Sequence, residues 1–134
     1  MSGNSPVAPA QPSELELLRA VVEQAPDAVI FADREGTIRV WNARAEALFG
    51  HAASEAIGKS LDLIIPPHLR AAHWRGYRQA IDAGQTRSDG KPMLTRATHK
   101  DGGKIYVELA FAIVSDERRE ILGALATARK PSKP

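Results

Sequence analysis

The residue best placed for ligand chemistry in this chain is the histidine at position 73. Between Pro67 and Ala83, apolar and small residues recur at i, i+3, i+4, i+7, i+8 and i+11, which is the spacing of one helix face. These residues are Leu69, Ala72, His73, Gly76, Tyr77 and Ala80. A neutral imidazole on an apolar face can donate an electron pair to a metal. The alternative is a core histidine that is hydrogen-bonded to a backbone carbonyl.

The other three histidines carry weaker signals. His51, His68 and His99 fall at predicted turns or strand ends, and no paired carboxylates stand near them at metal-ligand spacing. We therefore expect these three side chains to be solvated.

Signatures of catalysis are missing from the sequence. It has no glycine-rich phosphate loop, no His-x-x-x-His pair and no framework for a serine nucleophile. It also has no cysteine, which excludes disulfides, thiolate metal sites, cysteine nucleophiles and thioether-linked cofactors. The acidic pairs Glu14/Glu16 and Asp116/Glu117 lie on segments predicted to be exposed. We predict that the chain is not an enzyme.

Length and charge limit the other classes of function. A chain of 134 residues can bury one modest core, and a net charge of +2 gives no basic field for nucleic acid. No stretch approaches the roughly 20 apolar residues of a membrane span, and the N-terminus lacks a signal peptide. With no cysteine, these features predict a cytoplasmic protein without nucleic-acid or membrane partners.

Both ends of the chain differ from its body. Residues 1–12 and 130–134 are rich in proline, serine and small residues without periodicity, so we expect them to be flexible. Residues 13–24 predict an amphipathic helix, with a capping box that begins at Ser13. Its apolar residues are Leu15, Leu18 and Val22. The body, residues 25–129, is the predicted domain.

The body alternates between strand and helix patterns. Two short apolar runs around the turn Arg34-Glu35-Gly36 predict a β-hairpin, and the prolines at 66 and 67 open the longest helix, at about 67–83. Short helical segments precede it, and three strands follow at about 92–99, 104–115 and 120–128. The fold class is therefore α+β, with a five-stranded antiparallel sheet and helices on one face.

The middle of the last three strands has an uninterrupted period of two. Its apolar residues are Ile105, Val107, Leu109, Phe111 and Ile113. A slip of one residue would turn Tyr106 and Glu108 inward. We expect the apolar set to face the helices and Leu109 to be fully buried.

The order of elements and the residues at their joints resemble the PAS domain family. Three separated motifs carry the resemblance: APDAVIFADREGTIRVWNARAEALFGH at 25–51, AIGKSLDLIIPPHLRAAHWRGY at 56–77, and HKDGGKIYVELAFAIV at 99–114. The resemblance implies a sensor whose concave sheet and long helix enclose a ligand cavity. Here Leu109 and Phe111 and the helix face Leu69/His73/Tyr77 would line that cavity.

The stretch LDLIIPPHLRAAHWRGYRQA at 61–80 resembles the haem-binding PAS domains of an oxygen-sensing phosphodiesterase and of rhizobial oxygen-sensing kinases. The resemblance places His73 at the proximal iron position and implies haem b, while Gly76 would let the flat ring approach the helix backbone. Met93 stands where those relatives have an arginine that hydrogen-bonds oxygen. A thioether cannot donate that bond, but Met93 could ligate iron from the distal side. The phosphodiesterase's ligating methionine matches Lys91 instead.

Other ligands of the family are restricted by the composition. Light-oxygen-voltage photochemistry requires a cysteine beside the flavin, and cinnamate chromophores require a thioester, so both are excluded.

We expect a sensory domain that binds a small ligand, with haem b and O2, CO or NO as the named candidate, and that passes the signal to a separate effector. The alternative is a ligand-free dimerisation or docking module. The helix at 13–24 would mediate a homodimer, as often in the family. Three apolar residues are predicted to lie outside the cavity, namely Trp74, Ile81 and Leu18. For these residues, packing within one chain is preferred over a contact between the two copies of a dimer.

Overall fold

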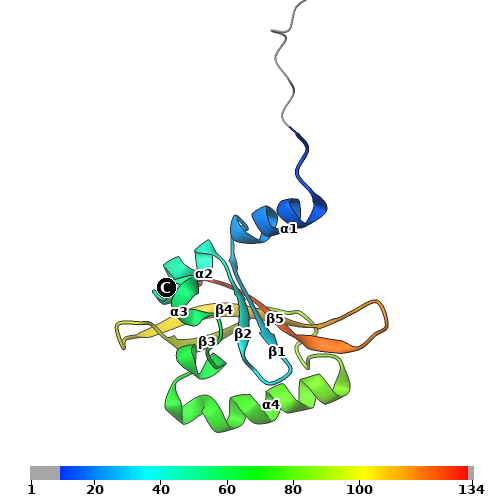
Figure 1. Ribbon diagram of the computed structural model, residues 1–134. Helices are drawn as coiled ribbons and strands as arrows, with labels where there is room; N and C mark the ends of the chain where they lie inside the picture. The colour runs from blue at the N-terminus through cyan, green and yellow to red at the C-terminus, as the bar shows by residue number, and fades with distance from the viewer. Residues whose placement is uncertain (1–9, 133–134) are drawn as a thin grey trace, which may run out of the picture.

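The computed structural model describes residues 10–132, which form one sheet with helices (Figure 1). Of the ends predicted to be flexible, residues 1–9 and 133–134 lie outside these residues. The helices are α1 (Glu14–Glu23), α2 (Ala43–Phe49), α3 (Ala53–Ala56) and α4 (Arg70–Ala83), with 3-10 turns η1 (Leu61–Ile64) and η2 (Pro67–Leu69). The strands are β1 (Ala28–Asp33), β2 (Ile38–Trp41), β3 (Met93–Thr98), β4 (Lys104–Ser115) and β5 (Ile121–Arg129).

The five strands form one antiparallel sheet in the order β2-β1-β5-β4-β3. The predicted α+β class and sheet are therefore confirmed. In β4, Val107 is fully buried, and Ile105, Leu109 and Ile113 pack against the buried clusters. Tyr106, on the opposite face, is 56% exposed. The period-two pattern thus predicted the register correctly.

The long helix starts later than predicted. Pro67 begins the 3-10 turn η2, and α4 proper begins at Arg70. It ends at Gly84, which adopts a left-handed conformation that glycine reaches without a steric penalty. Figure 1 shows α4 running along one side of the sheet.

Helix α1 has the predicted N-terminal cap but does not pack as preferred. The Ser13 side chain accepts from the Glu16 N–H at 3.0 Å, and the Glu16 carboxylate accepts from the Ser13 N–H. No residue of α1 is buried, and Leu18 is 54% exposed. The preferred packing of Leu18 within one chain is therefore wrong. The helix stands away from the body (Figure 1), and its C-terminal end is held by a hydrogen bond from Asn42 Nδ2 to the Val22 carbonyl.

Two buried clusters form the core. The larger surrounds Trp41, Phe49 and Val107, and the smaller consists of Ala32, Tyr77 and Ile81. Trp74 packs against the smaller cluster, so the preferred packing of Ile81 and Trp74 within one chain is confirmed. The space between the clusters holds the cavity described next.

Candidate functional site

A cavity of about 350 Å³ lies between the sheet and α4. This volume is within the range of small-molecule sites. Its walls come from every strand except β2 and from α2, η1, η2 and α4. The lining residues are Ile30, Ala32, Phe49, Leu61, Ile64, Ile65, Leu69, Ala72, His73, Tyr77, Met93, Thr95, Arg96, Ala97, Leu109, Phe111, Ala124, Leu125 and Ala126. Most of these side chains are apolar, so the few polar groups determine what the cavity can bind.

The structure brings six of the seven predicted site residues to this cavity. They are Leu69, His73, Tyr77, Met93, Leu109 and Phe111. Gly76 lies outside it, is exposed, and has open space where a Cβ would project. Gly76 lines the outer chamber described next, and the approach of a flat ring to its backbone stays a prediction. Leu109 is half-buried, contrary to the expectation of full burial, because it packs against the larger buried cluster and also borders the cavity.

An outer chamber of about 630 Å³ adjoins the cavity. Both chambers share the side chains of Ala72, His73, Tyr77, Met93, Phe111 and Ala124. The outer chamber also carries polar residues from the segment that follows α4, namely Gln85, Thr86, Arg87 and Ser88. An amphipathic ligand could therefore place its apolar body inside and its polar groups toward the outer chamber.

His73 projects between two aromatic rings of its own helix. Its ring centroid lies 4.7 Å from that of Trp74 and 5.7 Å from that of Tyr77. Its Nδ1 is buried and has no hydrogen-bond partner in the described part of the chain. Burial lowers the pKa of His73, although the Asp62 carboxylate opposes this effect. The imidazole is thus held neutral, with a buried nitrogen that the protein leaves unsatisfied.

Tyr77 is already engaged with the sheet. Its O–H donates to the Asp33 carbonyl at 2.6 Å, with the Ala32 carbonyl at 3.2 Å. Burial, with the nearby Asp33 charge, raises the pKa of Tyr77 to about 12. The phenol therefore fixes α4 to β1 and stays protonated.

Strand β3 supplies the wall that carries Met93. Met93, Thr95 and Ala97 alternate along the strand and all line the cavity. Met93 is 47% exposed and borders both chambers, as His73 does. The thioether and the imidazole therefore border the same space from different elements.

Sequence reasoning missed the lining contributed by β1, β5 and the 3-10 turns. Ile30, Ile64, Ile65 and Ala126 line the cavity but were not proposed as site residues. The alternation in β1 was a usable signal, because Ala28, Ile30 and Ala32 are all buried on one face. The turn residues had no comparable period.

Two of the remaining histidines are less exposed than predicted. His51 and His99 are half-buried, whereas His68 is exposed. Gly50 ends α2 in a left-handed conformation, and the chain then returns so that the His51 carbonyl accepts from Trp41 Nε1 at 2.9 Å. The expectation that His51 and His99 are fully solvated is therefore wrong. Within residues 10–132, no three His, Asp or Glu side chains form a metal-binding group.

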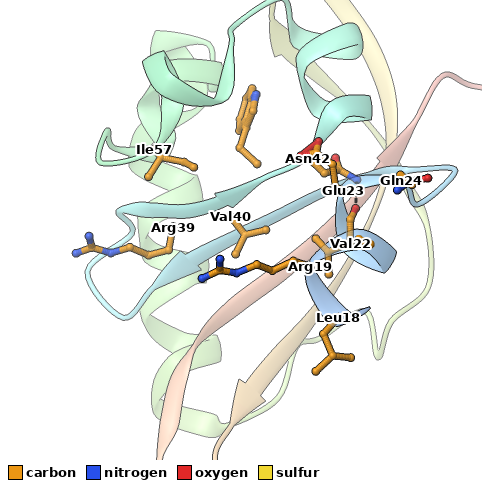
Figure 2. Close-up of a pocket in the computed structure, with 11 residues that line it drawn as sticks. Leu18, Arg19, Val22, Glu23, Gln24, Arg39, Val40, Asn42 and Ile57 are labelled. Atoms are coloured by element: carbon orange, nitrogen blue, oxygen red, sulfur yellow. Dashed lines mark hydrogen bonds between the residues drawn. The ribbon is translucent and has the colours of Figure 1, made fainter. Parts of the chain in front are cut away.

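A separate groove of about 570 Å³ lies between α1 and β2 (Figure 2). Leu18 and Val22 of α1 and Val40 of β2 line it, with Ile57 beyond β2 (Figure 2). The groove is mainly apolar.

Among the helices of residues 10–132, none is long and apolar enough to cross a bilayer.

Comparisons with known proteins agree on one family. Residues 16–131 match the family described as the PAS fold. The oxygen sensor protein DosP of Escherichia coli is 31% identical over 96 residues, which are 72% of this chain and 12% of DosP. The sensor protein FixL of Bradyrhizobium diazoefficiens is 38% identical over 56 residues, which are 42% of this chain and 11% of FixL.

A solved structure gives the same result for the fold. The PAS domain of a Colwellia psychrerythraea protein superposes with a TM-score of 0.76 at 24% identity, covering 91% of this chain and all of that one. This chain spans about one eighth of the length of DosP. The activities of the full-length relatives therefore do not follow from the match.

Proposed function

This chain belongs to the PAS fold family, as a sensory domain related to oxygen sensors, and from that premise we propose that it binds haem b and senses a diatomic gas. In this proposal residues 25–129 are the sensor, and a partner protein or domain carries out the response. The domain performs no catalysis itself. Its lack of cysteine favours a reducing, cytoplasmic location.

The observation that carries the proposal is the side chain of His73, which lines an apolar cavity and whose buried Nδ1 has no hydrogen-bond partner in the described residues. Buried polar atoms are nearly always hydrogen-bonded, so an exception calls for an explanation. The core-histidine alternative requires a backbone carbonyl as partner of Nδ1, which is missing in the described residues. A neutral imidazole is the form that binds iron, and Nε2, the ring nitrogen other than the buried Nδ1, would be the donor to a ligand in the cavity.

The remaining walls suit a flat ring with acidic substituents. Leu69 and Phe111 supply apolar surface, and Arg87 of the outer chamber supplies a cation for carboxylates. Met93 could serve as the distal ligand. When bound, haem iron would supply reversible binding of O2, CO or NO. Since Met93 donates no hydrogen bond, we expect CO to bind more durably than O2.

Haem binding by His73 can be tested by absorption spectroscopy. We expect the purified protein, reconstituted with haem, to show a sharp Soret band, and His73→Ala to weaken or shift it strongly. Because only the neutral imidazole donates to iron, affinity should fall as the pH drops through the lowered pKa of His73. Met93→Leu should alter chiefly the ferrous spectrum.

His68→Ala is the matched control, because His68 is exposed and five positions from His73 on the same segment. It should leave the spectrum unchanged. If His73→Ala binds haem with the parent spectrum and affinity, the ligand assignment is wrong and the core-histidine interpretation is preferred.

The alternative function, a ligand-free dimerisation or docking module, is favoured by the exposure of α1. Leu15, Leu17, Leu18 and Val21 are each more than 50% exposed, an unusual concentration of apolar side chains on one short helix. We propose that α1 pairs two copies of the chain. This association is compatible with haem binding, but it would be the sole function if the cavity binds nothing.

Pairing through α1 predicts that Leu15→Ser/Leu18→Ser halves the mass measured by light scattering. These side chains make no buried contact in the monomer, so the fold should be unaffected. Leu122→Ser is the control, since Leu122 is an exposed leucine on β5. The proposal is wrong if the parent protein is a monomer, or if the Leu15→Ser/Leu18→Ser variant is still a dimer.

A further inference from the structure

The ring of Trp74 connects the cavity histidine to the turn between β1 and β2. Trp74 does not line the cavity, yet its ring meets the His73 ring edge-on at 4.7 Å and the Tyr77 ring at 5.4 Å. Its Nε1 donates to the Asp62 carboxylate at 2.8 Å. Trp74 is thus fixed at its edge while its face limits the position of His73.

The six-membered part of the Trp74 ring lies against Gly36. Gly36 is buried, and a Cβ at this position would overlap with the six-membered part of the indole. Its φ of +83° also favours glycine. No larger residue fits without moving Trp74, so the turn and the indole are in direct contact.

The turn that contains Gly36 is itself well ordered by hydrogen bonds. The Asp33 carboxylate accepts from the N–H groups of Glu35 and Thr37 at 3.1 and 3.0 Å, and the Gly36 carbonyl accepts from the Leu61 N–H at 3.0 Å. Partial burial would raise the pKa of Asp33, but the N–H donors and Arg39 hold it below its usual value. The turn therefore offers Trp74 a firm support.

Resting on the proposed function, we propose that Trp74 is a positioning residue, which fixes the His73 ring and transmits its displacement to the Asp33–Thr37 turn. Trp74, Gly36 and Asp62 form one contact chain with His73 at its cavity end. The group bound at His73 is a haem iron, and the part of the surface that responds is the β1–β2 turn. By thermodynamic linkage, haem binding at His73 should alter the β1–β2 turn, and a change in the turn should alter haem affinity to the same extent.

The test measures His73 without haem. Nuclear magnetic resonance signals of the His73 ring report its environment. We expect Gly36→Ala and Trp74→Phe each to shift these signals. Gly58→Ala is the matched control, because Gly58 also has a positive φ, of +92°, but open space at its Cβ. It should leave His73 unchanged.

Combining the two substitutions separates positioning from general destabilisation. The smaller ring in Trp74→Phe removes the overlap with the Cβ of Gly36→Ala, although the positive φ of residue 36 remains unfavourable for alanine. The His73 signals of the double variant should therefore resemble those of Trp74→Phe alone, even where its stability is lower. With haem present, both single variants should lower affinity on the order of 10- to 100-fold, as expected for residues that orient a ligand. In the reverse direction, haem should shift the backbone signals of residues 33–37.

The outcomes distinguish the two proposals. If no haem binds but the His73 signals respond to Gly36→Ala and not to Gly58→Ala, the haem assignment fails and the positioning role stands. Should Gly36→Ala and Trp74→Phe leave the His73 signals and haem affinity at parental values, the positioning role is refuted while haem binding stands. If Gly36→Ala does not fold, Trp74→Phe alone decides by the same criteria.

Discussion

Phe49→Ala is expected to lower the free energy of unfolding by about 3–5 kcal/mol, the usual cost of removing a fully buried phenylalanine. Phe49 is the last residue of α2 and is completely excluded from solvent. Its ring centroid lies 5.5 Å from that of Trp41. Chemical denaturation monitored by circular dichroism measures the loss.

Phe111→Ala is the matched control for Phe49→Ala. Phe111 is half-buried and borders both chambers of the cavity, so the same deletion should cost only about 1–2 kcal/mol. Equal losses at the two positions would mean that Phe111 is as tightly packed as the core. The described cavity would then be incorrect. Phe111→Ala should instead act mainly on haem binding, because it removes a wall of the site.

The fold was predictable where apolar residues recur with one uninterrupted period along an element. Strand β4 was assigned with the bounds 104–115 that the structure shows, because twelve residues alternate without interruption. The start of α4 was placed at 67 instead of 70, since two prolines allow a 3-10 turn before the helix as readily as a first helical turn. Boundaries depend on such local competition, which periodicity does not resolve.

The site was predictable only from the elements that have a clear face. The phase of α4 brought Leu69, His73 and Tyr77 to the cavity, but it also included Gly76, which lies at the rim of the outer chamber. A helix face is wider than the opening it borders. The contacts of Trp74 with Gly36, distant in sequence, follow from the way the hairpin folds over α4, and no local pattern encodes them.

Burial of the first helix was mispredicted for a related reason. The amphipathic pattern indicates that burial of Leu15 and Leu18 would be favourable, but it does not indicate which surface covers them. In the structure α1 is joined to the body mainly by one polar residue, Asn42, whose Nδ2 donates to the Val22 carbonyl at 2.8 Å. A hydrogen bond from the body therefore contributes to the attachment of α1, while most of its apolar face stays exposed.

Asn42 has more partners than any other side chain in the described residues. It is 2% exposed, and its Oδ1 accepts from the N–H groups of Val29 and Ala45 at 2.8 and 3.0 Å. Its Nδ2 donates to the carbonyls of Val22 and Asp27 at 2.8 and 3.1 Å. One amide thus caps α2, fixes the start of β1 and holds the end of α1.

Asn42→Ala is accordingly expected to destabilise the protein by about 2–4 kcal/mol, because it removes an N-cap and leaves several partly buried backbone groups without partners. Asn42→Asp is the informative comparison. Its carboxylate can still accept from Val29 and Ala45 and cap α2, but it cannot donate to Val22 or Asp27. We expect it to retain much of the stability while amide hydrogen exchange in α1 becomes faster. If Asn42→Asp leaves exchange in α1 at the parental rate, the helix is attached by contacts other than Asn42. Any signal from the cavity to α1 would then have to pass through the groove beside β2 instead of this amide.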